Sequence, residues 1–134
     1  MKKILTLIMT TMMLIFGCNN NDSTPEISVE ELHDQVEKGV EVYLLDVRTL
    51  EEFTDNRLEF ADNLLPYDNL ENIQDQLPTD KSTLIYCFCR SGRRSGIATD
   101  YLRSVGYENV YNVTGGIIAW TKAGYETASG PFTK

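Results

Sequence analysis

One cysteine stands directly before a short basic stretch that contains glycine. Cys89 is followed by RSGRRSG, which includes Arg90, Arg93 and Arg94. Positive potential around a thiol favours the thiolate, and Gly92 lets the chain turn with its backbone N–H groups facing inward. These residue types favour a nucleophilic cysteine in an anion-binding loop. The alternative is a buried structural cysteine beside a solvated basic turn.

The flanking residues predict a strand before this loop and a helix after it. Residues 84–89 form an uninterrupted apolar run, which is typical of a parallel strand buried on both faces. Apolar residues recur at helical spacing from Ile97; Ser95 is expected to cap this helix and Gly106 to end it. Loop amides and a helix N-terminus converge at the carboxyl end of such a strand and bind anions there. The expected substrate-binding residues are Arg90, Ser91, Gly92, Arg93, Arg94 and Ser95.

Four segments, taken in order, resemble the rhodanese superfamily. The first is the CRSGRRS loop at 89–95, and the others are LLDVR…EEF at 44–53, GYENVY at 106–111 and GGIIAW at 115–120. The match covers about residues 27–127. It implies a rhodanese-like α/β fold, with a mainly parallel central sheet flanked by helices on both faces. The alternation of strand and helix signals independently favours this class.

The resemblance also implies sulfurtransferase chemistry. Cys89 would take the outer sulfur of an anionic donor such as thiosulfate, hold it as a persulfide and pass it to a thiol or protein acceptor. Loop amides would stabilise the persulfide anion. In the family, the aspartate and arginine at the positions of Asp46 and Arg48 support the active site, although a structural ion pair explains them equally well. No cofactor is implied, and no residues have metal-ligand spacing.

Three other functions are compatible with these residues. Cysteine-dependent phosphatases and arsenate reductases use a loop one residue longer than the four residues between Cys89 and Arg94. A thiol–disulfide or persulfide-relay protein would use Cys87 as a resolving thiol, whereas the simpler interpretation of Cys87 is a small buried hydrophobic residue. A binding module without turnover is the remaining alternative.

The N-terminal residues have the pattern of a bacterial lipoprotein signal. Lys2 and Lys3 precede an apolar run at 4–16, and Cys18 follows Gly17. The run is shorter than the roughly 20 residues of a comfortable transmembrane helix. Residues 15–18 resemble a lipobox with Cys18 as the lipidated residue; an ordinary secretory peptide is the alternative. We expect a signal peptide at 1–17, a flexible tether at 18–26 and a lipid anchor in the bacterial cell envelope.

The remaining sequence predicts one rhodanese-like domain at 27–128 and a tail at 129–134, acting as a monomer. The formal charge of −8 argues against nucleic-acid partners and against electrostatic membrane binding. Capping boxes at Ser28 and Thr49 predict helices from each, strands are expected at 42–47, 64–66 and 109–112, and a helix at 68–76. Trp120 is expected in the core and His33 on the surface. The family's glycine–histidine turn is missing at 55–63, so the pocket wall there is expected to differ.

Overall fold

The computed structural model describes residues 23–133, and within them five strands form a single sheet. The strand order is β1-β5-β4-β2-β3, and each neighbouring pair is parallel. The strands are β1 (Glu26–Ile27), β2 (Tyr43–Asp46), β3 (Asn63–Leu64), β4 (Leu84–Phe88) and β5 (Asn109–Val113). The predicted signal peptide and Cys18 lie outside the described residues.

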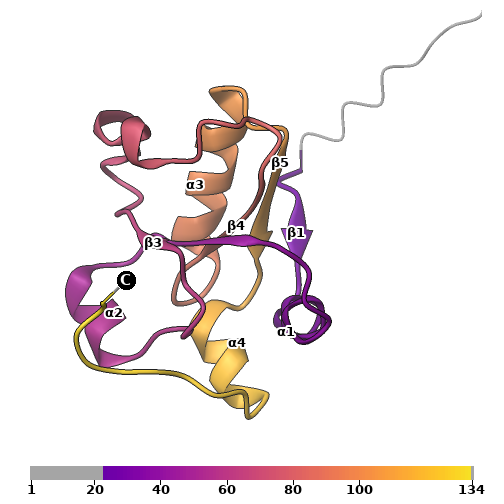
Figure 1. The fold of residues 1–134 in the computed structure, drawn as a ribbon, viewed down its shortest axis with the longest axis vertical. Coiled ribbons are helices and arrows are strands. Elements are labelled where there is room, and N and C mark those ends of the chain that lie inside the picture. The colour runs from indigo at the N-terminus through magenta and orange to yellow at the C-terminus, as the bar shows by residue number, and fades with distance from the viewer. Residues whose placement is uncertain (1–22, 134) are drawn as a thin grey trace, which may run out of the picture.

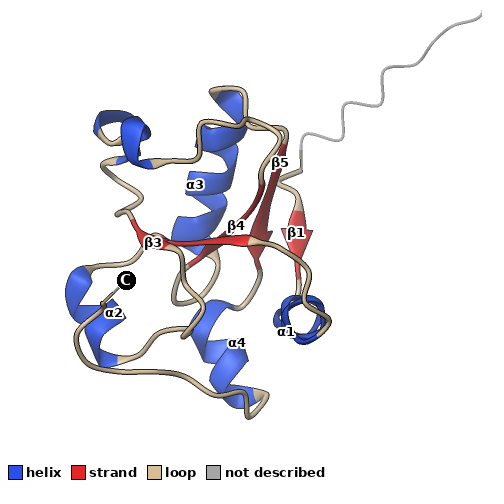
Figure 2. Cartoon of the chain, viewed as in Figure 1, coloured by secondary structure: helices blue, strands red, loops and turns tan. Residues whose placement is uncertain are grey.

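Helices cover both faces of this sheet. Figures 1 and 2 show α3 on one side of the strands and α1, α2 and α4 on the other. The α-helices are α1 (Val29–Glu37), α2 (Leu50–Asp55), α3 (Arg93–Ser104) and α4 (Gly116–Lys122), and the 3₁₀ helices are η1 (Leu70–Asn72) and η2 (Gln74–Gln76). The predicted α/β class, with its parallel sheet and helices on both faces, is confirmed.

The central strand β4 divides the core into two clusters. Tyr86 and Phe88 pack with residues of α1, α2 and α4, whereas Ile85 and Cys87 pack with residues of α3. Both faces of the strand are therefore covered, which explains its uninterrupted apolar run. Trp120 of α4 is buried in the first cluster, as predicted.

Local signals predicted two helix starts correctly, but they misplaced the cap of α3 and predicted one continuous helix that does not form. The capping boxes of Ser28 and Thr49 begin α1 and α2 as predicted. Ser95, predicted as a cap, instead lies inside the first turn of α3, because that helix begins at Arg93 with Gly92 as its N-cap. The helix predicted at 68–76 is replaced by η1 and η2, because Ile73 between them, with φ −127° and ψ 23°, lies outside the helical region.

The residues after α4 return to α2. Arg57 and Ala128 form an antiparallel bridge, and the Arg57 guanidinium donates to the carbonyl of Gly130 at 2.7 Å. The ring of Phe132 packs edge-on against Phe53 of α2. This segment therefore holds α2 against the rest of the fold. None of the helices between residues 23 and 133 is long and apolar enough to span a membrane.

Candidate active site

The basic loop begins where the central strand ends. Cys89 follows the last residue of β4, and β4 lies between β5 and β2 in the sheet. The loop turns at Gly92, whose φ of +101° is unfavourable for residues with a side chain. Residues 89–92 thus carry the chain from the carboxyl end of the strand into the N-terminus of α3, the place that the sequence predicted.

The sulfur of Cys89 receives hydrogen bonds from the loop that follows it. The Gly92 N–H and the Ser95 hydroxyl both lie 3.1 Å from Sγ. Burial alone would raise the pKa of this thiol, but the Ser95 hydroxyl and the N–H groups of Ser95, Gly92 and Ser91 lower it below its ordinary value. The site therefore favours an anionic sulfur although Cys89 is fully buried.

The N-terminus of α4 supports the loop from the other side. The N–H groups of Ile117 and Ile118 donate to the carbonyls of Cys89 and Arg90, at 3.0 and 3.2 Å. Gly116 makes this approach possible, because a Cβ there would overlap both carbonyl oxygens. The second glycine of the GGIIAW segment is therefore required for this loop geometry.

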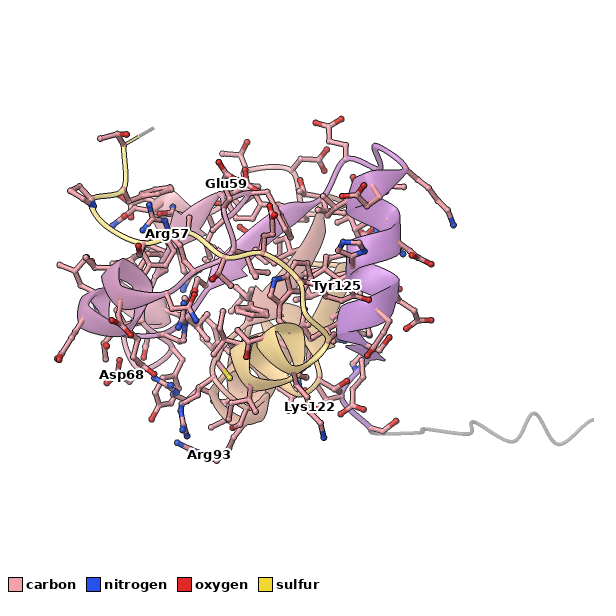
Figure 3. All side chains as sticks on the ribbon, turned by 90° about the horizontal axis from the view of Figure 1, so that it is seen from below. Arg57, Glu59, Asp68, Arg93, Lys122 and Tyr125 are labelled. Carbon is pink, nitrogen blue, oxygen red and sulfur yellow. The ribbon has the colours of Figure 1, made fainter. Side chains whose placement is uncertain are left out.

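The three arginines that follow Cys89, one in the loop and two at the start of α3, have different roles. Arg94 forms two hydrogen bonds with the carboxylate of Glu52 in α2, at 2.7 and 2.8 Å. This pairing holds the pKa of Glu52 at about 2. Arg90 and Arg93 are exposed, and Arg93 projects away from the fold in Figure 3. Two of the arginines are thus available to an anion in solution, and the third fastens the loop to α2.

Asp46 and Arg48 form a buried pair at the same edge of the sheet. Their closest charged atoms lie 2.7 Å apart, and both side chains are almost completely buried. The Arg48 guanidinium also donates to the carbonyl of Asn56 at 2.7 Å, just beyond the end of α2. The pair therefore anchors the helix that carries Glu52. Neither residue hydrogen-bonds to Cys89.

A cavity of about 150 Å³ lies beside the loop. It is lined by Arg48, Glu52, Asp55, Asn56, Arg90 and Ile117. Asp55 and Asn56 belong to the segment where the family's glycine–histidine turn is missing, so the chain's own residues form this wall. A larger cavity of about 310 Å³ lies between α1 and α4 and includes no residue of the loop. The smaller cavity includes Arg90 of the loop but not Cys89, so it lies beside the nucleophile and borders the loop.

Comparison with known proteins decides the family. Residues 28–123 match the rhodanese-like domain family, which is more than half of the chain. This chain belongs to the rhodanese-like family. A sulfurtransferase of Allochromatium vinosum is 37% identical to it over 99 residues, covering 74% of this chain and 90% of the relative. The adenylyltransferase and sulfurtransferase uba4 of Ogataea parapolymorpha is 38% identical over 96 residues, covering 72% of this chain and 23% of that protein.

Solved structures agree with this assignment. The crystal structure of a thiosulfate sulfurtransferase from Pseudomonas aeruginosa superposes with a TM-score of 0.72 at 27% identity, covering 81% of this chain and 21% of that one. The rhodanese-like domain described here thus spans most of the length of a small bacterial relative and less than a quarter of two larger proteins.

Cys87, the other cysteine of this rhodanese-like domain, is inaccessible to solvent. Cys87 has no exposed surface and packs in the core beneath α3. Burial raises the pKa of its thiol to about 12. A resolving thiol has to form a thiolate and reach its partner, and neither condition suits this position. The surroundings fit the alternative interpretation, a small buried hydrophobic residue.

The single histidine lies in an aromatic cluster. The His33 ring stacks on Tyr125 with centroids 3.9 Å apart and tilts against Trp120 at 5.7 Å. It is therefore half-buried rather than a plain surface residue, and it makes no hydrogen bond with Cys89. Between residues 23 and 133, no three histidine, cysteine, aspartate or glutamate side chains gather to hold a metal.

Sequence reasoning missed two residues of this rhodanese-like site. The sequence indicated Glu52 only as part of the Thr49 capping box and of the EEF segment, although it also pairs with Arg94. Asn112 of β5 contacts both Ser95 and Gly92, at 2.6 and 3.0 Å. The one available signal for Asn112 was a polar amide at the end of the strand predicted at 109–112, because a buried polar group needs a partner.

Proposed function

We propose that this rhodanese-like protein is a sulfurtransferase that carries a sulfane sulfur on Cys89. The donor is a small anionic sulfur compound such as thiosulfate, and the acceptor is a thiol or a protein. The observation that carries the proposal is the position of the Cys89 sulfur, 3.1 Å from the Gly92 N–H at the end of the central strand. The sulfurtransferase relatives and the length of the loop support it.

The proposed reaction has two displacement steps. The Cys89 thiolate attacks the outer sulfur of thiosulfate, the bond between its two sulfurs breaks, and sulfite leaves with the electron pair. Cys89 then holds a persulfide anion. An acceptor thiolate, or cyanide in an assay, attacks the outer sulfur of the persulfide, and the Cys89 thiolate is regenerated.

The residues around Cys89 suit both steps. The loop N–H groups and the Ser95 hydroxyl favour an anionic sulfur. The fold positions these donors before the reaction begins. Arg90 borders the cavity and can attract the donor and ease the departure of sulfite. Arg94 is engaged with Glu52, so it contributes mainly to the position of the loop.

The proposed location is the bacterial cell envelope, with the domain held to a membrane through a lipid on Cys18. The apolar run before Gly17-Cys18 supports this part of the proposal. Expression of the chain and of Cys18→Ser in a lipoprotein-processing bacterium tests it. Membrane association and the mass of a lipid should both be lost in the variant, and equal membrane association of the two would contradict the lipid anchor.

The decisive experiment for the enzyme is the intact mass of the reduced chain after exposure to thiosulfate. We expect a gain of one sulfur, located on Cys89 by peptide mapping and removed by cyanide. Cys89→Ser should gain none, and Cys87→Ser should gain as much as the parent protein. A folded, reduced chain without any gain would exclude thiosulfate as donor, and equal loss in both variants would contradict the assignment of Cys89.

A further inference from the structure

The Ser95 hydroxyl faces two acceptors with a single hydrogen. Its Oγ lies 3.1 Å from the Cys89 sulfur and 2.6 Å from Oδ1 of Asn112. A serine hydroxyl has one hydrogen to donate. Ser95 therefore cannot give a full hydrogen bond to the sulfur and to the amide oxygen at the same time.

The orientation of the Asn112 amide is fixed by its other end. Nδ2 donates to the carbonyl of Gly92 at 3.0 Å, which leaves Oδ1 directed at Ser95. Asn112 is only 5% exposed, and the α-carbon of Gly96 packs so closely that a Cβ there would lie 3.3 Å from Nδ2. The amide is therefore closely packed, and its hydrogen bond to Gly92 holds it in this orientation.

Through this amide, β5 reaches the two residues whose N–H and O–H lie 3.1 Å from the Cys89 sulfur. Gly92 supplies the N–H and Ser95 the O–H, and the Asn112 side chain contacts each of these residues. With a protonated thiol, the Cys89 S–H can donate to Ser95 Oγ while Ser95 donates to Asn112. A thiolate can only accept, so Ser95 donates to it only when the Ser95 hydrogen leaves Asn112 and turns to the sulfur.

We propose that Asn112 is a positioning residue that sets the acidity of Cys89 through Ser95. Its Oδ1 competes with the thiolate for the Ser95 hydrogen and so restrains the acidity, while its Nδ2 holds the loop at Gly92. The inference deepens the proposed function, because the acidity of Cys89 governs how much nucleophile is present. It concerns the thiol itself and needs no sulfur donor.

A double-mutant cycle with Asn112→Ala and Ser95→Ala isolates this coupling. The readout is the thiolate absorbance of the full chain as a function of pH, after subtraction of the same background carrying Cys89→Ser. Several charged or titratable groups surround the loop. They are Cys87 of β4, Arg90 of the loop, Arg93 and Arg94 of α3, Asp46 of β2 and Glu52 of α2. They are unchanged in all four proteins, so their influence cancels.

Asn112→Ala frees the Ser95 hydrogen for the thiolate, but it also loosens Gly92. Loosening should act in both backgrounds, whereas the freed hydrogen acts only where Ser95 is present. We therefore expect Asn112→Ala to change the acid dissociation constant of Cys89 differently in the two backgrounds. The change in the acid dissociation constant caused by Asn112→Ala should differ about fivefold between the two backgrounds, which corresponds to one net hydrogen bond. The change should favour stronger acidity when Ser95 is present.

Equal effects of Asn112→Ala in both backgrounds would overturn the proposal. Far-ultraviolet circular dichroism confirms folding of each variant. If Asn112→Ala does not fold, Asn112→Asp takes its place in the cycle, and the expected weakening of Cys89 acidity should be larger with Ser95 present. These titrations remain valid if no donor loads Cys89, so failure of the inference and failure of the sulfurtransferase assignment are distinguished.

Discussion

Arg94 of α3 and Glu52 of α2 form a two-pronged ion pair that closes one side of the Cys89 loop, with N–O distances of 2.8 and 2.7 Å. The two residues are 42 positions apart in the chain. An arginine fork matched to a carboxylate fixes orientation as well as distance. The pair therefore ties the start of α3 to α2, which Arg48 anchors in turn.

Removal of the Glu52 charge should reveal a pH-dependent stability. Pairing lowers the pKa of Glu52 from 4.5 to about 2, so its contribution is complete above pH 4.5 and is lost as the pH falls towards 2. Glu52→Gln should lower the free energy of unfolding at neutral pH by about 0.5 to 1 kcal/mol, because the pair is partly exposed to solvent. Denaturant titrations at several pH values measure the difference between the two proteins.

That difference should shrink on acidification and nearly vanish around pH 2. Glu31→Gln is a matched control, because Glu31 caps α1 in the same way but pairs with no arginine in the described chain. A Glu52→Gln deficit that is independent of pH would contradict the assigned ion pair.

Cys87 and Cys89 should respond differently to removal of their thiols. Cys87→Ala leaves a small gap in a closed core and should cost about 1 kcal/mol of stability, while Cys89 still takes up sulfur. Cys89→Ala should abolish sulfur uptake. Thermal unfolding and intact mass after thiosulfate measure the two effects. Loss of uptake in folded Cys87→Ala would revive the relay interpretation.

The sequence predicts local contacts but not contacts between residues that lie far apart in the chain. The turn at Gly92 and the capping box at Thr49 depend on residues within a few positions, so their sequence patterns suffice. The contacts of Glu52 with Arg94 and of Asn112 with Ser95 join different elements, and only the packing of those elements brings them together. Ser95 shows the difference most clearly: its type suits a cap, but its position directs the hydroxyl to Cys89.

Gly116 should be essential for the loop because of its close contacts with the loop carbonyls, in addition to its positive φ. Gly116→Ala places a Cβ into the carbonyls of Cys89 and Arg90, whereas Gly124→Ala meets open space. Both glycines have positive φ, so each variant should lose about 1 kcal/mol of stability through strain. Only Gly116→Ala should also lose sulfur uptake by Cys89, because the loop carbonyls have to move.

Chemical unfolding and the rate of persulfide formation distinguish the two contributions. Equal stability losses with unchanged sulfur uptake in both variants would show that the loop tolerates displacement. Uptake lost in Gly124→Ala as well would point to a general effect on the fold instead of the contact at Gly116.

Arg90 should attract the anionic donor, because it is exposed and borders the cavity beside the loop. Arg90→Gln should slow persulfide formation from thiosulfate about tenfold, as for one charge-assisted hydrogen bond. Arg103→Gln is the matched control, since Arg103 is exposed in the last turn of α3, at the other end of that helix. The rate of persulfide formation can be followed by mass spectrometry of quenched samples at increasing salt. The difference in rate between the parent protein and Arg90→Gln should narrow, because salt screens the attraction. Equal rates for the two variants would assign donor attraction to the remaining charges of the loop.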